Sequence, residues 1–354
     1  MQHPQLLLST ENRQAFERVS SGLKHLEAYK ESKDWSAVTK AASDLDQAVT
    51  MDPGYTAARY YAGIADDLAG RAADGADVLA PLLTQPLDEK FLNYIRYALA
   101  LAEYHQYHAA NLAKAAQILS ELLTQAPDYI LKTSTHALLA QVHAMQEVSR
   151  PSLQSAEATA THAWMPLTLA PAPLEEVVSM ATKSKEAANT ARDLLSGPQA
   201  NALQPQLRAQ LGAMLDNALG MSEMYRVDHD RTGALQRLKA ALKHLEAADR
   251  ASPNDWANTC DLGSVHMRFG IVTGNEHEFD EARRWLQHVV KKLRPEYGFA
   301  LYEIGRTYRL QGNFADAVLW FDRALAVAQR YRDVSDKRVQ REISLARESK
   351  TDYP

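Results

Sequence analysis

The stretch 298–330 constrains the fold of this chain more than any other, and it reads GFALYEIGRTYRLQGNFADAVLWFDRALAVAQR. The pair Gly312-Asn313 divides it into two segments with the apolar spacing of helices, joined by one tight turn. Small residues stand where the two helices must touch, at Gly305 on the first and at Ala317 and Ala324 on the second. A hairpin of this kind cannot bury its own apolar face, so we expect several of them in a stack.

The second half of this pattern recurs upstream as a small residue, a large residue four positions later, another apolar residue three further on, and then a proline. The copies are Ala41, Leu45, Ala48 and Pro53; Ala115, Leu119, Leu122 and Pro127; Ala241, Leu245, Ala248 and Pro253; and Ala282, Leu286, Val289 and Pro295. Because proline cannot continue a helix, each proline is predicted to end the second helix of a unit.

The first helices are less regular. Leu262-Gly263 and Ala62-Gly63 are copies of Ile304-Gly305, and 88–107 reads as an aromatic-rich first helix. Gly263 and Ala282 are 19 positions apart, whereas Gly305 and Ala317 are 12 apart. The additional residues fall in GIVTGNEHEFDE, which predicts an enlarged polar turn.

The stretch 298–330 closely resembles one tetratricopeptide repeat. The resemblance is strong over 254–330, moderate over 34–127 and weak over 150–230. It implies an all-α fold, a right-handed superhelix (α-solenoid) of helix-turn-helix hairpins. The charged segment 333–349 is predicted to form one amphipathic helix, which suits the polar outer face of a C-terminal cap.

Two proline-containing stretches, 165–173 and 196–205, break the rhythm and leave one predicted helix between them, over about 174–195. We therefore divide the chain into an N-terminal helical block (1–165), an irregular connector (166–205) and a C-terminal block with its capping helix (206–354). One continuous superhelix with an irregular middle is favoured, and two blocks joined by a hinge remain the alternative.

Composition limits the function. Hydrophobic residues make up 46 % and charged residues 23 %, as in an ordinary folded chain. The net charge of −5 argues against a nucleic-acid binder. The single Cys260 excludes an internal disulfide framework and fits a reducing compartment, so a cytoplasmic location is expected. No apolar run approaches the roughly 18 residues that a membrane span requires, so no membrane insertion is expected.

Catalytic motifs are missing from the sequence. It contains no Gly-x-Ser-x-Gly, no phosphate-binding loop and no His-Glu-x-x-His. His105 and His108 could share a helix face, but two ligands do not make a structural zinc site. We therefore expect neither an enzyme nor a cofactor, and an active site at a turn such as 270–279 stays open.

In tetratricopeptide proteins the first helix of each pair lines a concave groove, and helical spacing shows which residues would do so here. Tyr302, Arg306 and Arg309 form a stripe beside the face that packs on the partner helix, with Phe299 at its start. Tyrosine and arginine dominate binding hot spots. The other groove residues that we predict are Ser264, Arg268, Tyr94 and Tyr97. The alternative is that these side chains pack between repeats.

One subclass of the family grips the C-terminal carboxylate of chaperones with Lys, Asn and Arg. Here Cys260, Ser264, Phe299 and Glu303 stand at the corresponding places, so that clamp is not expected. The resemblance implies a non-catalytic scaffold or adaptor that binds a protein or peptide along the concave groove. A regulatory sensor, whose superhelix changes shape on binding, is the alternative. The partner's identity and homo- or hetero-oligomer formation stay open.

Overall fold

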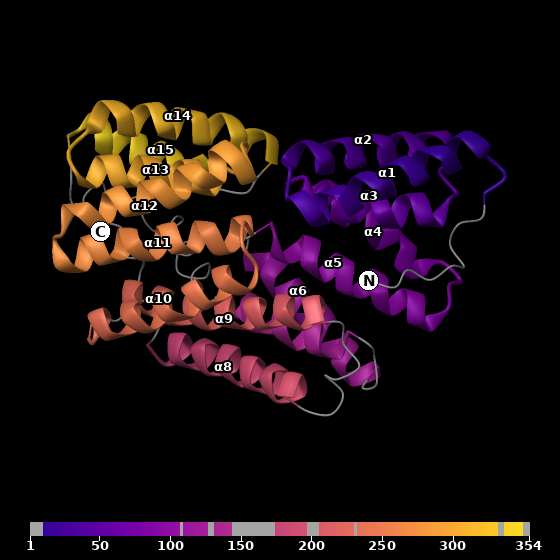
Figure 1. Ribbon diagram of the computed structural model, residues 1–354, viewed down its shortest axis with the longest axis horizontal. Coiled ribbons are helices and arrows are strands. Elements are labelled where there is room, and N and C mark those ends of the chain that lie inside the picture. Colours follow the sequence, from indigo (N-terminus) through magenta and orange to yellow (C-terminus); the bar gives the residue numbers. More distant parts are fainter. Residues whose placement is uncertain are drawn as a thin grey trace.

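The computed structural model describes residues 10–106, 109–126, 131–143, 174–196, 205–229, 232–331 and 336–349. Every regular element in these ranges is a helix, and consecutive helices pack as hairpins, which confirms the all-α prediction. Figure 1 shows the hairpins following one another along a path that curves from the N-terminal helices to the C-terminal ones. No helix in the described ranges has the length and apolar content that crossing a membrane would require.

The helices of the N-terminal part are α1 (Arg13–Ser32), α2 (Trp35–Met51), α3 (Thr56–Leu68), α4 (Ala72–Leu79), η2 (Ala80–Thr84), α5 (Glu89–Tyr104) and α6 (Ala109–Gln125). Residues 132–143 are also helical. The helices that follow are α8 (Leu174–Ser196), α9 (Pro205–His229), α10 (Ala234–Ala251), α11 (Trp256–Thr273), α12 (Glu276–His288), the π-helical turn η5 (Val289–Leu293), α13 (Gly298–Leu310), α14 (Phe314–Tyr331) and α15 (Asp336–Arg347).

The helix ends follow the proline signals. Helix α2 ends two residues before Pro53, α10 ends two before Pro253, and η5 ends two before Pro295, which confirms these three predictions. Pro127 lies outside the described residues. After Pro253 the next helix begins on a polar cap, whereas α3 and α13 begin on tyrosines without a side-chain cap. At α11, Asp255 Oδ1 accepts hydrogen bonds from the amides of Ala257 and Asn258, at 3.0 and 3.1 Å.

Five of the described hairpins are closed by a glycine of the first helix that lies against a large side chain of the second. A Cβ on Gly305 would lie 2.5 Å from Phe321 Cε1, so the two helices approach closer than any side chain at Gly305 would allow. Ala317 and Ala324 flank Phe321 and are fully buried. The other pairs are Gly22 with Leu45, Gly63 with Leu79, Gly220 with Leu245, and Gly263 with Leu286, at 2.5 to 2.7 Å.

The predicted enlarged turn after Gly263 is wrong. Helix α11 continues to Thr273 and α12 begins at Glu276, so the additional residues extend both helices instead of forming a polar loop. Gly274 ends α11 in the left-handed conformation (φ 69°), with its amide bonded to the carbonyl of Gly270 at 2.8 Å. Phe279 of the extended α12 is buried against Gly270 of the extended α11, which stabilises the longer helices.

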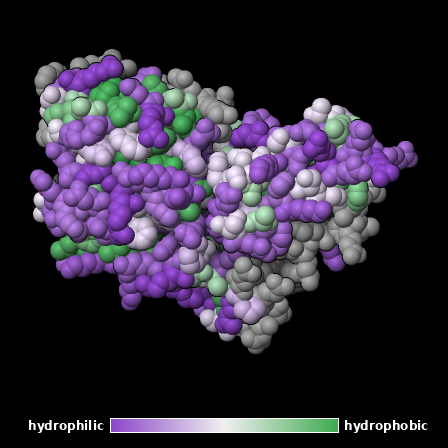
Figure 2. Space-filling model, turned by 45° about the horizontal axis from the view of Figure 1, so that its top comes forward, coloured by the Kyte–Doolittle hydropathy of each residue, from purple (hydrophilic) through white to green (hydrophobic). Residues whose placement is uncertain are grey.

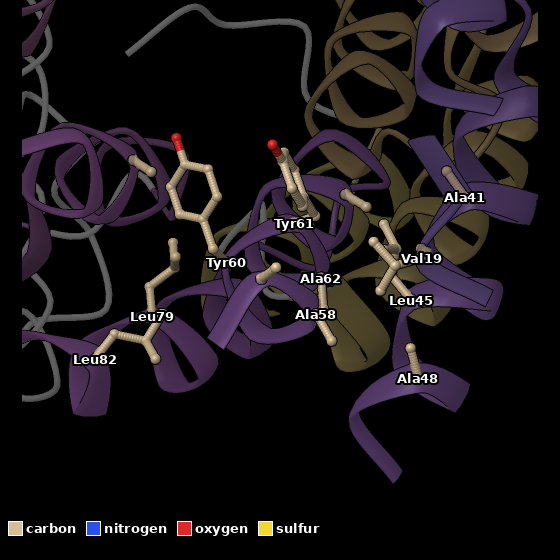
Figure 3. Close-up of a cluster of buried hydrophobic side chains, with 14 of the residues drawn as sticks. Val19, Ala41, Leu45, Ala48, Ala58, Tyr60, Tyr61, Ala62, Leu79 and Leu82 are labelled. Carbon is tan, nitrogen blue, oxygen red and sulfur yellow. The ribbon is translucent and has the colours of Figure 1, made fainter. Parts of the chain in front are cut away.

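The N-terminal core is built from the first two hairpins. Figure 3 shows Val19 and Leu45 on one side and Leu79 and Leu82 on the other, with alanines of α3 between them. These alanines let three helices come close, and the rings of Tyr60 and Tyr61 fill the remaining space. The ring of Tyr60 also meets Phe91 of α5, edge to face, at 5.2 Å between centroids, so the core extends into the third hairpin.

The predicted helix at about 174–195 is confirmed as α8. Its buried alanines pack with Ala137 and Ala140 of the helical segment 132–143 and with Leu211 and Leu215 of α9. The proline-rich stretch 165–173 lies outside the described residues, as does most of 196–205. Through α8, the described helices before and after these stretches share one packed core.

The close approach of the two helices at a contact glycine can be tested by adding a Cβ to that glycine. Gly305→Ala should lower the free energy of unfolding by about 1–3 kcal/mol, because a Cβ at this position overpacks against Phe321. The matched control is Gly212→Ala in α9, where a Cβ meets nothing within 4 Å. That variant should gain roughly 0.5–1 kcal/mol from helix propensity. Urea unfolding of both variants checks the prediction, and equal stabilisation would contradict it.

Candidate partner-binding surface

The predicted stripe on α13 lies in the interior of the protein. The exposed fractions of Tyr302, Arg306 and Arg309 are 3 %, 8 % and 0 %, and among residues 298–307 only Phe299 is partly exposed. Our expectation that this stripe faces a partner across an open groove is therefore wrong in its premise. The spacing identified a second face of α13 correctly, but that face is covered.

Helix α15, the predicted cap, accounts for part of this covering. Arg309 Nε donates a hydrogen bond to Glu342 Oε2 of α15 at 2.6 Å, and Arg306 Nε lies 3.8 Å from Glu342 Oε1. Arg306 also donates from Nη1 to Glu303 Oε1 at 2.8 Å. These are buried, charge-assisted contacts, so the two arginines bind carboxylates of their own chain.

Two other predicted residues belong to the same set of contacts. Ser264 and Arg268 of α11 are buried, and Arg268 Nη1 donates to the carbonyl oxygen of Ser264 at 3.2 Å. Ser264 Oγ donates to Glu303 Oε2 of α13 at 3.4 Å. The guanidinium of Arg268 lies 4.9 Å from the ring centroid of Tyr225, on α9. Ser264 and Arg268 thus connect three successive first helices instead of facing solvent.

An amide bridge extends these contacts toward the N-terminal part. Gln141 Nε2 donates to Asn217 Oδ1 at 3.0 Å, and Asn217 Nδ2 donates to Asp261 Oδ2 at 2.8 Å. We call the whole set the inner polar network, and it comprises Gln141, Asn217, Asp261, Ser264, Arg268, Glu303, Arg306, Arg309 and Glu342. Its three arginines face three carboxyl groups, so its formal charges balance.

The ionisation of Asp261, a member of this network, is perturbed by its burial. Desolvation by burial raises its pKa from 3.8 to about 7, against the lowering effects of the Asn217 hydrogen bond and of Arg268. Glu303 and Asp255 contribute in the same direction as burial. Around neutral pH the network therefore holds a carboxyl group that is close to half-protonated.

The remaining predicted residues are half-buried aromatics. Tyr94 and Tyr97 lie on α5, where burial raises the pKa of both phenols and Tyr97 shares a hydrogen bond with Ser134. Phe299 lies at the start of α13, far in sequence from both. The structure does not bring all eight predicted residues together: Tyr94 and Tyr97 are separate from the network, and Phe299 lies at its edge.

Phe299 belongs to a line of rings that sequence reasoning did not identify as a unit. Trp256 and Tyr297 meet edge to face at 4.9 Å, Tyr297 lies 6.1 Å from Phe299, and Phe299 lies 6.3 Å from Tyr302. We call Trp256, Tyr297, Phe299 and Tyr302 the aromatic row. Trp256 and Phe299 are partly exposed, so the row begins in the interior and reaches the surface.

In the described ranges, no cluster of three or more His, Cys, Asp or Glu could hold a metal ion. His105 Nδ1 lies 2.8 Å from Asp67 Oδ1, and His108 is outside the described residues. The acidic partners Glu303 and Glu342 were missed by the sequence prediction. Glu303 had a local signal, its position three residues before Arg306.

No family model matches the chain, and no curated protein matches it. Solved structures similar to it include a tetratricopeptide repeat protein from Parabacteroides merdae, with 11 % identity, a TM-score of 0.46 and coverage of 95 % of this chain and 100 % of that one. The yeast Sti1 TPR2AB domain in complex with pHSP90 is similar at 14 % identity and a TM-score of 0.32, covering 94 % and 98 %. Yeast Tom70 is similar at 12 % identity and a TM-score of 0.26, covering 95 % of each chain.

The chain's own packing defines the class. Paired helices, a glycine against a large residue in five of the described hairpins, and prolines after the second helices make an all-α repeat of sequential helical hairpins. A polar network with balanced formal charges is buried between its helices, and the partly exposed members of the predicted site are all aromatic.

Arg309→Ala should lower the free energy of unfolding by about 3–5 kcal/mol, because it leaves Glu342 buried without its closest partner. The control is Arg250→Ala on α10, whose side chain is mostly exposed beside Glu246, and which should change stability by less than about 1 kcal/mol. Chemical denaturation measures both. Equal, small effects would contradict the assignment of Arg309 to a structural network.

The pKa of Asp261 predicts a pH-dependent stability difference. Because the folded-state pKa lies above the usual 3.8, this group contributes stability below pH 4 that is lost as pH rises toward 7. Asp261→Asn keeps an acceptor for Asn217 and removes that loss. The variant should gain stability relative to the wild type between pH 5 and 8, up to about 1.4 kcal/mol for each unit of raised pKa. The control is Asp322→Asn, at an exposed position. If the stability that Asp261→Asn gains over the wild type does not grow as the pH rises from 5 to 7, the prediction is contradicted.

Proposed function

We propose that this protein is a non-catalytic scaffold or adaptor of the cytoplasm that binds a protein or peptide through its helical repeat. The observation that carries the proposal is the aromatic row, which reaches the surface at Trp256 and Phe299. Large rings held by neighbouring rings lose little conformational entropy on binding, which is why such residues dominate binding hot spots.

The contacts of the inner polar network favour one kind of partner. Arg306 and Arg309 already bind Glu303 and Glu342, so an acidic segment would have to replace internal carboxylates to bind there. An apolar or aromatic side chain of a partner needs no such exchange at the aromatic row. We therefore propose that the partner presents apolar side chains, and that acidic residues contribute little to its affinity.

The face of the molecule in Figure 2 agrees with a local recognition site rather than one extended apolar surface. In Figure 2 most of the visible surface is hydrophilic, and the larger hydrophobic areas lie over the C-terminal helices, on the left as in Figure 1. Separate small patches of this kind are what an adaptor requires to stay monodisperse until it meets a partner.

The non-catalytic part of the proposal is supported by the pairing of the buried carboxylates. Glu303 and Glu342 accept hydrogen bonds from arginines, and Asp261 accepts one from Asn217. A general acid or base must reach a substrate proton, and these groups are directed at their own neighbours.

Phe299→Ala should weaken partner binding by about 2 kcal/mol, roughly a 30-fold loss of affinity, while the helices stay folded. Proteins captured from the native cells by the wild-type chain would be compared with those captured by the variant. The control is Leu319→Ala on α14, an apolar residue that is 59 % exposed and does not belong to the row. Partners retained by wild type and Leu319→Ala but lost with Phe299→Ala support the proposal, and undiminished capture by Phe299→Ala contradicts it.

A further inference from the structure

An arginine of the C-terminal part connects it to the first two hairpins of the helical stack. Arg294 lies just after η5, in the C-terminal part, and its side chain is 3 % exposed. It contacts Trp35 at the start of α2 and the Gly70 turn between α3 and α4, more than 200 positions away along the chain. In Figure 1 the path of the chain curves round so that the N-terminal hairpins lie beside the C-terminal ones. We infer that Arg294 is a clasp that closes the helical repeat on itself, and that the repeat opens when the clasp is released.

Three aromatic rings surround the guanidinium. Its central carbon lies 4.3 Å from the ring centroid of Trp256, 4.6 Å from that of Tyr297 and 5.8 Å from that of Trp35. These distances are within the range of cation–π attraction. Trp256 and Tyr297 belong to the C-terminal part, like Arg294, and hold its guanidinium in position. Trp35 belongs to the N-terminal part and completes the cage of rings.

Gly70 brings the opposite backbone against the same arginine. This glycine has a φ of 85°, in the left-handed region, and a Cβ on it would lie 2.5 Å from Arg294 Nη2. An arginine at the surface could move aside, but this one is confined between three rings. The turn therefore reaches the clasp only because position 70 has no side chain.

Ring faces, more than hydrogen bonds, hold the charge. Among the described residues, the buried Nε of Arg294 has no hydrogen-bond partner. Burial raises the pKa of Tyr29 on α1 to about 12. Smaller contributions come from Asp255 and Asp67, which raise it, and from Arg294, which lowers it, so these three charged groups lie near Tyr29. A second contact crosses the junction beside the clasp, where the ring of His105, paired with Asp67, lies 5.9 Å from Trp256.

The clasp differs in kind from the other contacts of the fold. Helices elsewhere pack mainly on their neighbours in sequence, through continuous apolar cores. The junction instead depends on one cation, one turn and a few rings. Releasing it leaves each hairpin core intact, so the chain can change its overall dimensions without unfolding. Because Trp256 and Tyr297 also belong to the aromatic row, the state of the clasp would affect the proposed partner site, although the clasp itself does not rest on that proposal.

Small-angle scattering of the full chain tests the clasp without any partner. Arg294→Met keeps the length of the side chain and removes its charge, and it should increase the radius of gyration. Arg294→Lys keeps a cation within the cage and should give dimensions closer to those of the wild type. Far-UV circular dichroism of each variant verifies that the helices are retained.

A glycine pair makes the test independent of substitutions at Arg294. Gly70→Ala forces a Cβ against the guanidinium, and it should also increase the radius of gyration. Gly274→Ala imposes the same kind of left-handed strain (φ 69°) where nothing lies within 4 Å, and it should leave the dimensions unchanged. Helical Arg294→Met and Gly70→Ala variants that both scatter like the wild type would overturn the clasp. Failure of partner capture in the Phe299 experiment would leave this result unaffected.

Discussion

The contact that the rest of this fold depends on is a glycine without a Cβ against a large side chain of the next helix. Gly305 against Phe321 and Gly263 against Leu286 fix how close the helices of a hairpin come. The same glycines set the register of the inner face. Asp261 and Glu303 each stand two residues before a contact glycine, and Ser264 and Arg306 each stand one residue after it. Equivalent positions on successive first helices are thereby aligned, and the inner polar network runs along them.

The spacing of these pairs explains which parts of the fold could be predicted. Gly63–Leu79 and Gly305–Phe321 are 16 positions apart, whereas Gly22–Leu45 and Gly263–Leu286 are 23 apart. Seven residues are about two helical turns, one for each helix of the hairpin. The repeat pattern therefore identified the hairpins and their prolines, but not their lengths. Composition alone placed Gly274 in a loop. The structure shows that it is the C-cap of α11, between two helices that are longer than the pattern predicted.

The burial of the predicted stripe on α13 was missed for a different reason. Helical periodicity places Tyr302, Arg306 and Arg309 on one face, but it cannot say what covers that face. The covering partner of Arg309 is Glu342, 33 positions away, on a helix whose charged composition suggested only a solvated cap. Arginine was chosen as a recognition residue, and it is equally suited to holding carboxylates inside a superhelix. The prediction of Phe299 depended less on distant sequence, since this residue reaches the surface beside Tyr297.

A stack of hairpins gains its stability from neighbour contacts, so its first and last units are ordinarily independent of each other. The junction at Arg294 removes that independence, because Trp35 and Gly70 on one side depend on the position of Trp256 and Tyr297 on the other. Each cation–π contact contributes about 0.5–2 kcal/mol, which is small beside a hairpin core but large enough to change the ratio of closed to open molecules several-fold. An interaction of that size would make closure adjustable, so that the proposed binding at the aromatic row and the contact with the first hairpins would be parts of one equilibrium.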